Sequence, residues 1–411
     1  MSELAILGGH PILEKKPAYM KWPTGGPLER EALLRTLDSG VWGTLGEENA
    51  AFARRYAEYC GVKHALPVLN GTVSLELIFR ALEIGYGDEV IVPPYTFSAS
   101  VHGIILAGAA PVFADIEPDT YTICPKSVEE NITSRTKAIL GVHLGGRPVD
   151  MDALGVIACK YGLYLIEDAA HAHGSEWCGQ RTGSLGEAGS FSFQASKNIS
   201  CGEGGAITTN NTKLYERLWS LHHNGRGYGD GGYDHPLLGT DARLAEWQCA
   251  VLSARMDRID QDIESRMHAA ARLDEALGKL PFIEVMRQDP RITRNALHLY
   301  TFKYKADALG GLPRDLFIRA LDAENVCMPA IGYSEPIYDM QMLYTEDYRR
   351  MTGCRFENPK DMLPYNERAA RVEGCWLYHS SLLGTDRDTD RIVEGFERVA
   401  AGAEQLRRSL T

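Results

Sequence analysis

The 411-residue sequence lacks any long apolar run, any paired-cysteine motif and any excess of positive charge. No segment approaches the ~20 consecutive apolar residues that a membrane-spanning helix requires, so we expect no membrane span. The nine cysteines are scattered and no two form a C-x-x-C pair, so the sequence offers no candidate zinc site. The formal net charge of −12 argues against a surface built for nucleic acid, although it does not exclude a local basic pocket for one phosphate.

The chain length indicates the domain organisation, and the first residues and the cysteines indicate the cellular compartment. With 411 residues the chain is too long for one small core. We therefore expect a large domain over residues 1–260, with an N-terminal arm, and a smaller domain over residues 261–411. The first nine residues carry no basic segment and too short an apolar run for a secretory signal peptide. Scattered cysteines suit a reducing compartment, so we expect a cytoplasmic protein.

Strand-like and helix-like segments alternate through the first half of the chain. Strands are predicted over residues 62–69, 89–92, 110–116, 137–142, 163–166, 189–193 and 206–209. Helices are predicted over residues 72–82, 97–107, 151–161 and 214–224. This alternation is typical of an α/β fold with a mostly parallel sheet covered on both faces. Ligands of such sheets bind at the carboxyl ends of the strands.

The second half is predicted to begin with a long helical stretch. It covers residues 243–280 and is interrupted near Arg258. A strand over residues 299–304 and helices over residues 314–323 and 388–408 follow it. We expect these later elements to form the smaller domain.

Two short segments about thirty residues apart carry the strongest chemical signal. The segment 165–174 ends an apolar strand at an acid, Asp168, and the segment 190–205 places Lys197 among small and hydroxyl residues before a glycine-rich turn. A lysine that forms a Schiff base and an acid that keeps the pyridine nitrogen protonated are the two groups that pyridoxal 5′-phosphate (PLP) needs. Either residue alone is better explained as a surface lysine or a helix N-cap aspartate, so other segments must decide.

An anion site is predicted where Asn70, Gly71 and Thr72 lie between a strand and a helix. Main-chain N–H groups at a helix N-terminus bind phosphate, although the same residues also suit an ordinary turn with a threonine N-cap. Ser192, five residues before Lys197, is placed to reach the same phosphate. Phe97 follows another strand end, where an aromatic ring either covers a planar cofactor or packs in the core.

Taken together and in this order, these segments resemble the DegT/StrS family of PLP-dependent sugar aminotransferases, which have the aspartate-aminotransferase fold (fold type I). The resemblance covers nearly the whole chain, through residues 40–46, 59–65, 70–72, 87–93, 111–116, 142–145, 167–171, 192–197 and 202–205. It implies a large domain with a mostly parallel seven-stranded sheet between helices, and a smaller C-terminal α+β domain. It also implies bound PLP and a homodimer with shared active sites.

The resemblance gives a role to each candidate residue. Lys197 would form the Schiff base and carry protons, and Asp168 would pair with the pyridinium nitrogen. Phe97 would stack on the cofactor ring, and His171 would hydrogen-bond its hydroxyl group. Gly71, Thr72 and Ser192 would hold the phosphate. Gln194, on the same strand as Ser192, would line the pocket.

One position departs from the family pattern. Within the segment 239–248 the family usually has Asn or Lys where Asp241 stands, and that residue reaches the phosphate of the partner subunit's cofactor. A carboxylate repels a phosphate unless a cation lies between them, and Arg243 and Arg226 are the candidates for that cation. Asp241 is therefore carried over as a cofactor-binding residue whose phosphate role is open.

The segments 170–174, 309–313 and 375–383 are most similar to the cyclitol branch of the family, with its glutamine-dependent scyllo-inosose and 2-deoxy-scyllo-inosose aminotransferases and its aminohydroxybenzoate synthases. The resemblance implies transfer of an amino group from glutamine or glutamate to a keto-cyclitol or keto-sugar, in aminocyclitol, amino-sugar or antibiotic biosynthesis. A nucleotide-linked keto-sugar aminotransferase is the first alternative. A PLP-dependent sugar dehydratase or lyase is the second, but dehydratases of the family replace the lysine with histidine. A PLP-binding sensor without catalysis is disfavoured by the intact Lys197 and Asp168.

Overall fold

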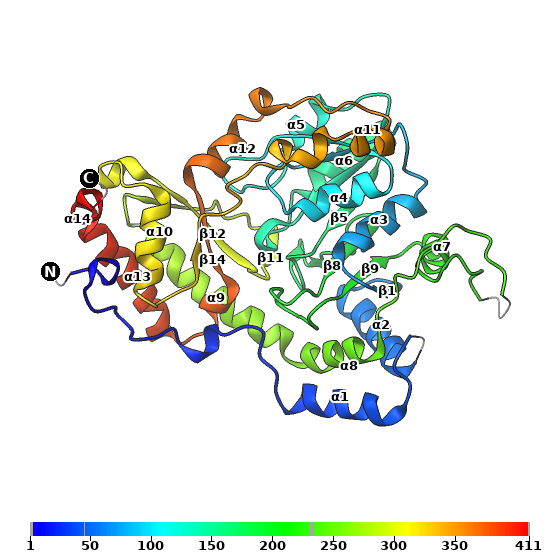
Figure 1. Ribbon diagram of the computed structural model, residues 1–411, viewed down its shortest axis with the longest axis horizontal. Helices are drawn as coiled ribbons and strands as arrows, with labels where there is room; N and C mark the ends of the chain where they lie inside the picture. Colours follow the sequence, from blue (N-terminus) through cyan, green and yellow to red (C-terminus); the bar gives the residue numbers. More distant parts are fainter. Residues whose placement is uncertain (1–2, 45, 230–232, 410–411) are drawn as a thin grey trace.

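A seven-stranded sheet forms the centre of the larger part of the molecule (Figure 1). The computed structural model describes residues 3–44, 46–229 and 233–409. In spatial order the strands are β1 (His64–Val68), β9 (Gly205–Thr209), β8 (Ala188–Ser192), β5 (Tyr164–Asp168), β4 (Thr136–Val142), β2 (Glu89–Val92) and β3 (Ala110–Phe113). From β8 to β3 the neighbouring strands are parallel, and β9 runs antiparallel to both β1 and β8. The mostly parallel sheet predicted from the sequence is confirmed.

Alternate side chains of the strands enter cores on opposite faces of this sheet. Val90 and Val92 pack with helices α3 (Gly71–Ala81), α4 (Ser98–Leu106) and α7 (Thr212–His222). Ile91, between them, packs on the other face with α6 (Met151–Tyr161). On that second face α2 (Glu47–Cys60) and α8 (Glu246–Arg255) cover the β1, β9 and β8 side. Burial on both faces explains why these strands read as continuous apolar runs.

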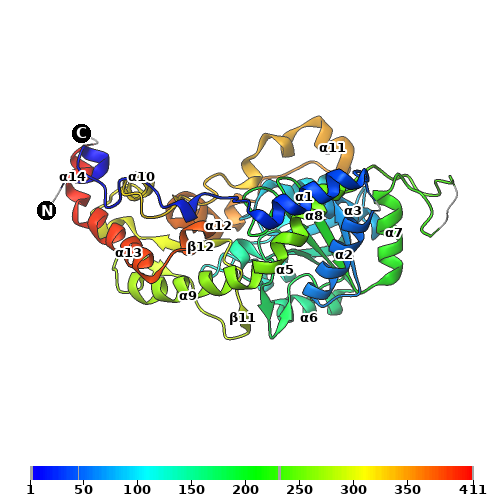
Figure 2. The ribbon, with the colours of Figure 1, turned by 90° about the horizontal axis from the view of Figure 1, so that it is seen from below.

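The smaller part is built on a four-stranded antiparallel sheet (Figure 2). Its strands are β10 (Ile283–Val285), β12 (Leu299–Tyr304), β14 (Gly374–Tyr378) and β13 (Pro329–Ala330). The helices α9 (Ile259–Leu277), α10 (Arg314–Ala323), α13 (Asp386–Ala401) and α14 (Ala403–Arg408) pack around it. Further elements are α5 (Pro125–Glu130), α11 (Glu346–Thr352), α12 (Pro364–Arg368) and a small sheet of β11 (Ile292–Arg294), β6 (Glu176–Trp177) and β7 (Gln180–Arg181).

Between β13 and β14 the chain runs back over the larger part, where Ile337 and Leu363 pack in the core with α3 and α4. Two further crossings between the parts lie next to each other. One crossing is the junction of α8 and α9, which a single 3-10 turn separates near the predicted break at Arg258. The other is the N-terminal arm, which runs along the smaller part before α1 (Pro27–Ser39) packs beside α8 (Figures 1 and 2). Arg255 joins the crossings, because its Nη1 donates to the carbonyl of Thr24 at 2.7 Å and lies 3.4 Å from the Glu29 carboxylate.

The arm itself is held by charged side chains of the smaller part. The buried Glu324 carboxylate accepts hydrogen bonds from the main-chain N–H groups of Ala5 at 3.1 Å and Ile12 at 3.0 Å. Arg398 of α13 donates to the carbonyl of Glu3 at 2.9 Å. The domain limits proposed at residue 260 stay a prediction. Within the described ranges, no helix is long and apolar enough to cross a membrane.

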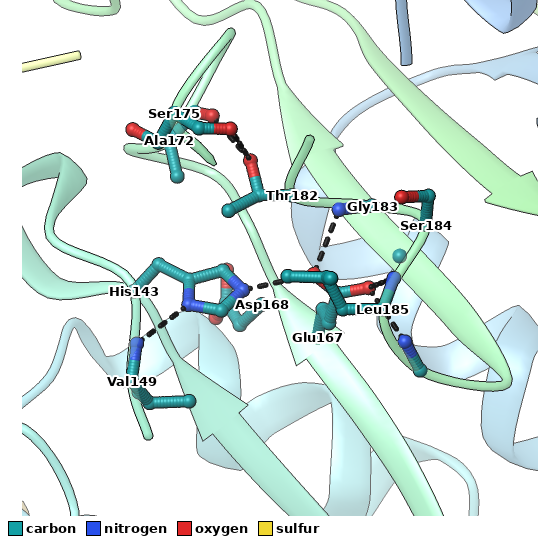
Figure 3. A network of polar contacts seen from close by, with 12 residues as sticks. His143, Val149, Glu167, Asp168, Ala172, Ser175, Thr182, Gly183, Ser184 and Leu185 are labelled. Atoms are coloured by element: carbon teal, nitrogen blue, oxygen red, sulfur yellow. Dashed lines mark hydrogen bonds and ion pairs between the residues drawn. The ribbon is translucent and has the colours of Figure 1, made fainter. Parts of the chain in front are cut away.

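Neighbouring carboxylates of β5 have different environments, because successive side chains of a strand point to opposite faces. Glu167 is fully buried, and His143 donates to it from Nε2 at 3.0 Å, since Nδ1 of His143 already accepts the N–H of Val149 (Figure 3). Three main-chain N–H groups of one turn also donate to Glu167, at 2.7–2.9 Å: Gly183, Leu185 and Gly186. Glu167 therefore fixes the turn that leads into β8.

Replacing Glu167 with Gln tests this role. The amide would turn an N–H group toward donors that now face an oxygen, so we expect Glu167→Gln to lower the free energy of unfolding by about 3 kcal/mol. Thermal and urea unfolding of the cofactor-free protein measure the change. Glu129→Gln is the matched control, because the Glu129 ion pair with Lys160 is on the surface and should leave the melting temperature unchanged. Equal melting temperatures for the two variants would contradict the assignment.

Candidate active site

A cavity of about 540 Å³ lies at the carboxyl ends of the central strands, between the larger and the smaller part. Its position is the one that the α/β fold predicts for a ligand. It brings together the residues that the sequence predicts to be catalytic or cofactor-binding, except Asp241. The predicted residues that line the cavity are Gly71, Thr72, Phe97, Asp168, His171, Ser192, Gln194 and Lys197.

Lys197 lies in a turn that follows β8, and its environment favours the neutral amine. Its main-chain N–H donates to the carbonyl of Gln194 at 2.9 Å, and its own carbonyl accepts the indole N–H of Trp22 at 3.0 Å. Burial removes water from the ammonium group and lowers the pKa of Lys197 from 10.5 to about 8, although the nearby Asp168 opposes the shift. A lysine of this kind is a candidate nucleophile and proton carrier.

Asp168 ends β5 with its carboxylate held at two points. One oxygen, Oδ2, accepts the Ser100 hydroxyl at 2.7 Å, and the other, Oδ1, accepts the N–H of Ala170 at 3.2 Å. The residue is 6% exposed and lines the cavity. A buried carboxylate with two donors on the protein side is suited to pair with a cationic group on the cavity side.

The N-terminus of α3 forms the anion-binding end of the cavity. Asn70 is its N-cap, since its side chain accepts the N–H of Val73 at 2.9 Å, so the alternative that made Thr72 the cap is wrong. A Cβ atom on Gly71 would lie 3.0 Å from the Cβ of Ser192, so glycine lets this helix end approach the end of β8 closely. Main-chain N–H groups and the Ser192 hydroxyl then face one small volume, as a phosphate requires.

Histidine rings form the wall beside Lys197. His171 Nδ1 accepts the N–H of Gly145 at 3.3 Å, and its ring lies 4.2 Å from the ring of His298. Burial holds the pKa of His171 well below its usual value, and the Lys197 charge lowers it further, so the ring is neutral and carries its proton on Nε2. That N–H group is available to a hydroxyl or phenolate oxygen.

The exposure of Phe97 and the position of Gln194 can each be compared with what the sequence predicts. Phe97 is 57% exposed at the cavity, so the alternative that placed it in the core is wrong. Gln194 lies just beyond β8 rather than on it, and its Oε1 accepts the N–H and the hydroxyl of Ser196, both at 2.8 Å. Both residues still line the cavity.

Asp241 lies outside this cavity and is paired with Arg243. The guanidinium group donates to both carboxylate oxygens, at 2.7 Å from Nε and 2.6 Å from Nη2. This pairing lowers the pKa of Asp241. Arg243 is therefore the candidate cation that accompanies Asp241, while Arg226 lies over the ring of Tyr233.

Several lining residues were not found by sequence reasoning. Ser100 follows a predicted strand end by eight residues and carries no motif of its own. The wall contributed by the smaller part comes from positions far along the chain, and no local pattern marks them. The residues missed in this wall are Leu299, Tyr333, Trp376 and Tyr378, and His298 lies beside them.

Comparison with known proteins finds similarity over nearly the whole chain. Residues 24–394 match the DegT/DnrJ/EryC1/StrS aminotransferase family. An L-glutamine:2-deoxy-scyllo-inosose aminotransferase of Streptomyces fradiae is 34% identical over 97% of this chain and 98% of its own length. The crystal structure of a 3-amino-5-hydroxybenzoic acid synthase is similar with a TM-score of 0.84 and 32% identity, over 94% of this chain and 100% of that one.

A second solved structure is similar over the whole length. It is DesI in the presence of its TDP-sugar product, with a TM-score of 0.84 and 32% identity over 99% of each chain. The family match spans more than half of the sequence, and the similar proteins cover nearly all of it. The chain belongs to the DegT/DnrJ/EryC1/StrS aminotransferase family.

Proposed function

We propose that this aminotransferase uses PLP to move an amino group from glutamine or glutamate to the keto group of a cyclitol or a sugar. The observation that carries the proposal is that Lys197, Asp168 and the N-terminus of α3 meet in one cavity. The name of the Streptomyces fradiae relative, which acts on glutamine and 2-deoxy-scyllo-inosose, supports the substrate class.

The residues of the cavity fit the parts of PLP one by one. The helix end at Gly71 and Thr72, with Ser192, would hold the phosphate. Asp168 would face the pyridine nitrogen, and His171 would donate to the ring hydroxyl. When bound, the cofactor supplies an electron sink that stabilises a carbanion at the donor's α-carbon.

Lys197 would have two tasks in this arrangement. Its neutral amine would anchor the cofactor covalently in the resting enzyme. Once the donor has displaced it, Nζ would take the proton from the donor's α-carbon and return a proton to the acceptor's carbon in the second half-reaction. The lowered pKa of Lys197 suits both tasks, because a larger share of the amine is neutral near neutral pH.

A nucleotide-linked keto-sugar is the second candidate acceptor. The similarity to DesI with its TDP-sugar product favours it. Assays that offer 2-deoxy-scyllo-inosose and a TDP-linked keto-sugar in parallel, each with glutamine and with glutamate, distinguish the two. Turnover of the cyclitol ketone alone supports the first proposal, and turnover of the TDP-sugar alone replaces it.

We also propose a homodimer with shared active sites. Helix α1 turns Glu29, Ala32 and Thr36 inward, while Leu34 and Leu37 of the same helix are 52% and 50% exposed. An apolar helix face open to water marks an interaction surface. A second copy of the chain is the occupant that the family resemblance implies, and it would bring the Asp241 segment to the partner's cofactor.

The proposed anchor can be identified chemically. Reduction of the PLP-loaded protein with borohydride, followed by peptide mapping, should place the label on Lys197. Lys197→Ala should bind PLP reversibly and lose transamination, whereas Lys160→Ala, a surface variant, should behave like the parent protein. A label on another lysine would contradict the assignment.

The pKa of Lys197 predicts a pH dependence for cofactor loading. Only the neutral amine attacks the aldehyde, so the rate at which the cofactor-free protein takes up PLP should rise as the pH passes through about 8. Burial disfavours the charged amine, so its cost to stability is present below pH 8 and is relieved between pH 8 and the unfolded value of 10.5. Stopped-flow absorbance measures the rate. A rise that begins only near 10.5 would show that the amine is solvated.

The Asp241–Arg243 pair predicts opposite effects of two substitutions. If Arg243 lies between Asp241 and the partner's phosphate, Asp241→Asn should keep or improve PLP affinity, and Arg243→Gln should weaken it roughly tenfold. Equilibrium titration with PLP and sedimentation at the same protein concentration measure affinity and assembly. A PLP-saturated, active monomer would contradict the shared-site proposal.

A further inference from the structure

Two hydroxyl groups lie in a line behind Asp168. The Ser100 hydroxyl is 2.7 Å from Oδ2 of Asp168, and the Thr96 hydroxyl is 2.8 Å from the Ser100 oxygen. Thr96 is 4% exposed and Ser100 is 1% exposed, so water does not compete for these bonds. Thr96 precedes Ser100 by four positions across the start of α4, which brings both hydroxyls to the same side of the first helical turn.

The chemistry of the groups fixes the direction of the line. A carboxylate only accepts, so Ser100 must spend its single proton on Asp168. The Ser100 oxygen then accepts, and Thr96 must be the donor. The result is a directed chain of donors from Thr96 through Ser100 to the carboxylate. Each bond in such a chain polarises the next one in a low-dielectric interior.

The line also limits how Asp168 can turn. The Ser100 hydroxyl holds Oδ2, and the N–H of Ala170, at 3.2 Å, holds Oδ1 less closely. Without the Ser100 hydroxyl, the 3.2 Å bond from Ala170 would be the hydrogen bond that still fixes the carboxylate plane within the described part of the chain. The orientation of the lone pairs that face the cavity therefore depends on Ser100.

We propose that Ser100, supported by Thr96, is a positioning residue that aims the Asp168 carboxylate at the pyridine nitrogen of the cofactor. This inference rests on the proposed function, in which Asp168 faces that nitrogen. Ser100 does not itself touch the cofactor in this proposal, and its whole effect passes through Asp168. If Ser100 only contributed to the packing of α4, its effect on cofactor binding would be independent of the Asp168 carboxylate.

A double-mutant cycle on cofactor binding separates these roles. PLP dissociation constants are measured by absorbance titration of cofactor-free protein for the parent, Ser100→Ala, Asp168→Asn and the double variant. We expect Ser100→Ala to weaken PLP binding by roughly 10-fold, the effect of losing a hydrogen bond to a charged group. In the Asp168→Asn background the same change should cost less than about twofold. Independent, multiplying effects would overturn the proposal.

Thr96 offers a second comparison that does not depend on Ser100. Thr96→Val keeps the shape and removes the hydroxyl, whereas Thr96→Ser keeps the hydroxyl and removes the methyl group. The proposal expects weaker PLP binding and a shifted pH midpoint of the bound cofactor's absorbance for Thr96→Val, with the parent values restored in Thr96→Ser. If Thr96→Ser binds PLP more weakly and Thr96→Val matches the parent, Thr96 has a packing role and the proposed line of hydrogen bonds is overturned. This comparison can be made even if Ser100→Ala does not fold.

Two controls separate failure of this inference from failure of the proposed function. Ser98→Ala removes a hydroxyl of the same helix that makes no hydrogen bond among the described residues, so the PLP affinity of this variant should match that of the parent. If Asp168→Asn leaves PLP affinity and absorbance unchanged, Asp168 does not face the ring nitrogen, and both proposals fall. If Asp168→Asn has a large effect and Ser100→Ala multiplies it, only the positioning role falls.

Discussion

The alternation of β5 places two carboxylates back to back, and the arrangement of the site depends on it. Glu167 turns away from the cavity and is satisfied by His143 and by the turn at residues 183–186. Asp168 turns toward the cavity and keeps part of its carboxylate for a ligand. The turn that Glu167 holds leads into β8, and β8 leads to Lys197, so one buried acid positions the strand that carries the lysine loop.

The electrostatics of the cavity concentrate on Lys197 and Asp168. The histidines near them are neutral, because burial holds the pKa of His171 and His298 well below the usual value and lowers that of His379 to about 3. Their rings lie in a row, with 4.2 Å between the centroids of His171 and His298 and 5.5 Å between those of His298 and His379. Neutral rings add hydrogen-bonding groups beside the lysine without further positive charge, so the proton on Nζ responds mainly to burial and to Asp168.

The sequence predicts the parts of this molecule whose cause is local. Asp168 ends a strand that is buried on both faces, and Lys197 follows another, so the apolar pattern of the strands also locates the two reactive side chains. The parallel sheet and the break near Arg258 are confirmed. Helix α1 was missed because its leucines face outward and its buried positions are Glu29, Ala32 and Thr36, which inverts the usual pattern. Tyr333 and Trp376 reach the cavity through the packing of the smaller part, and Ser100 matters through one contact, so neither has a local signal. The roles of the site residues stay predictions.

Two of the chain crossings are joined by Arg255, and the segment between β13 and β14 connects the two parts again. A single flexible linker would let the smaller part swivel in any direction, whereas several crossings, two of them pinned to each other, restrain its movement. The N-terminal arm also carries Trp22, whose indole bonds the main chain at Lys197 and whose ring packs on His379. Any movement of the smaller part would therefore be felt at the main chain of Lys197, because the same arm bonds the lysine loop and packs against the smaller part.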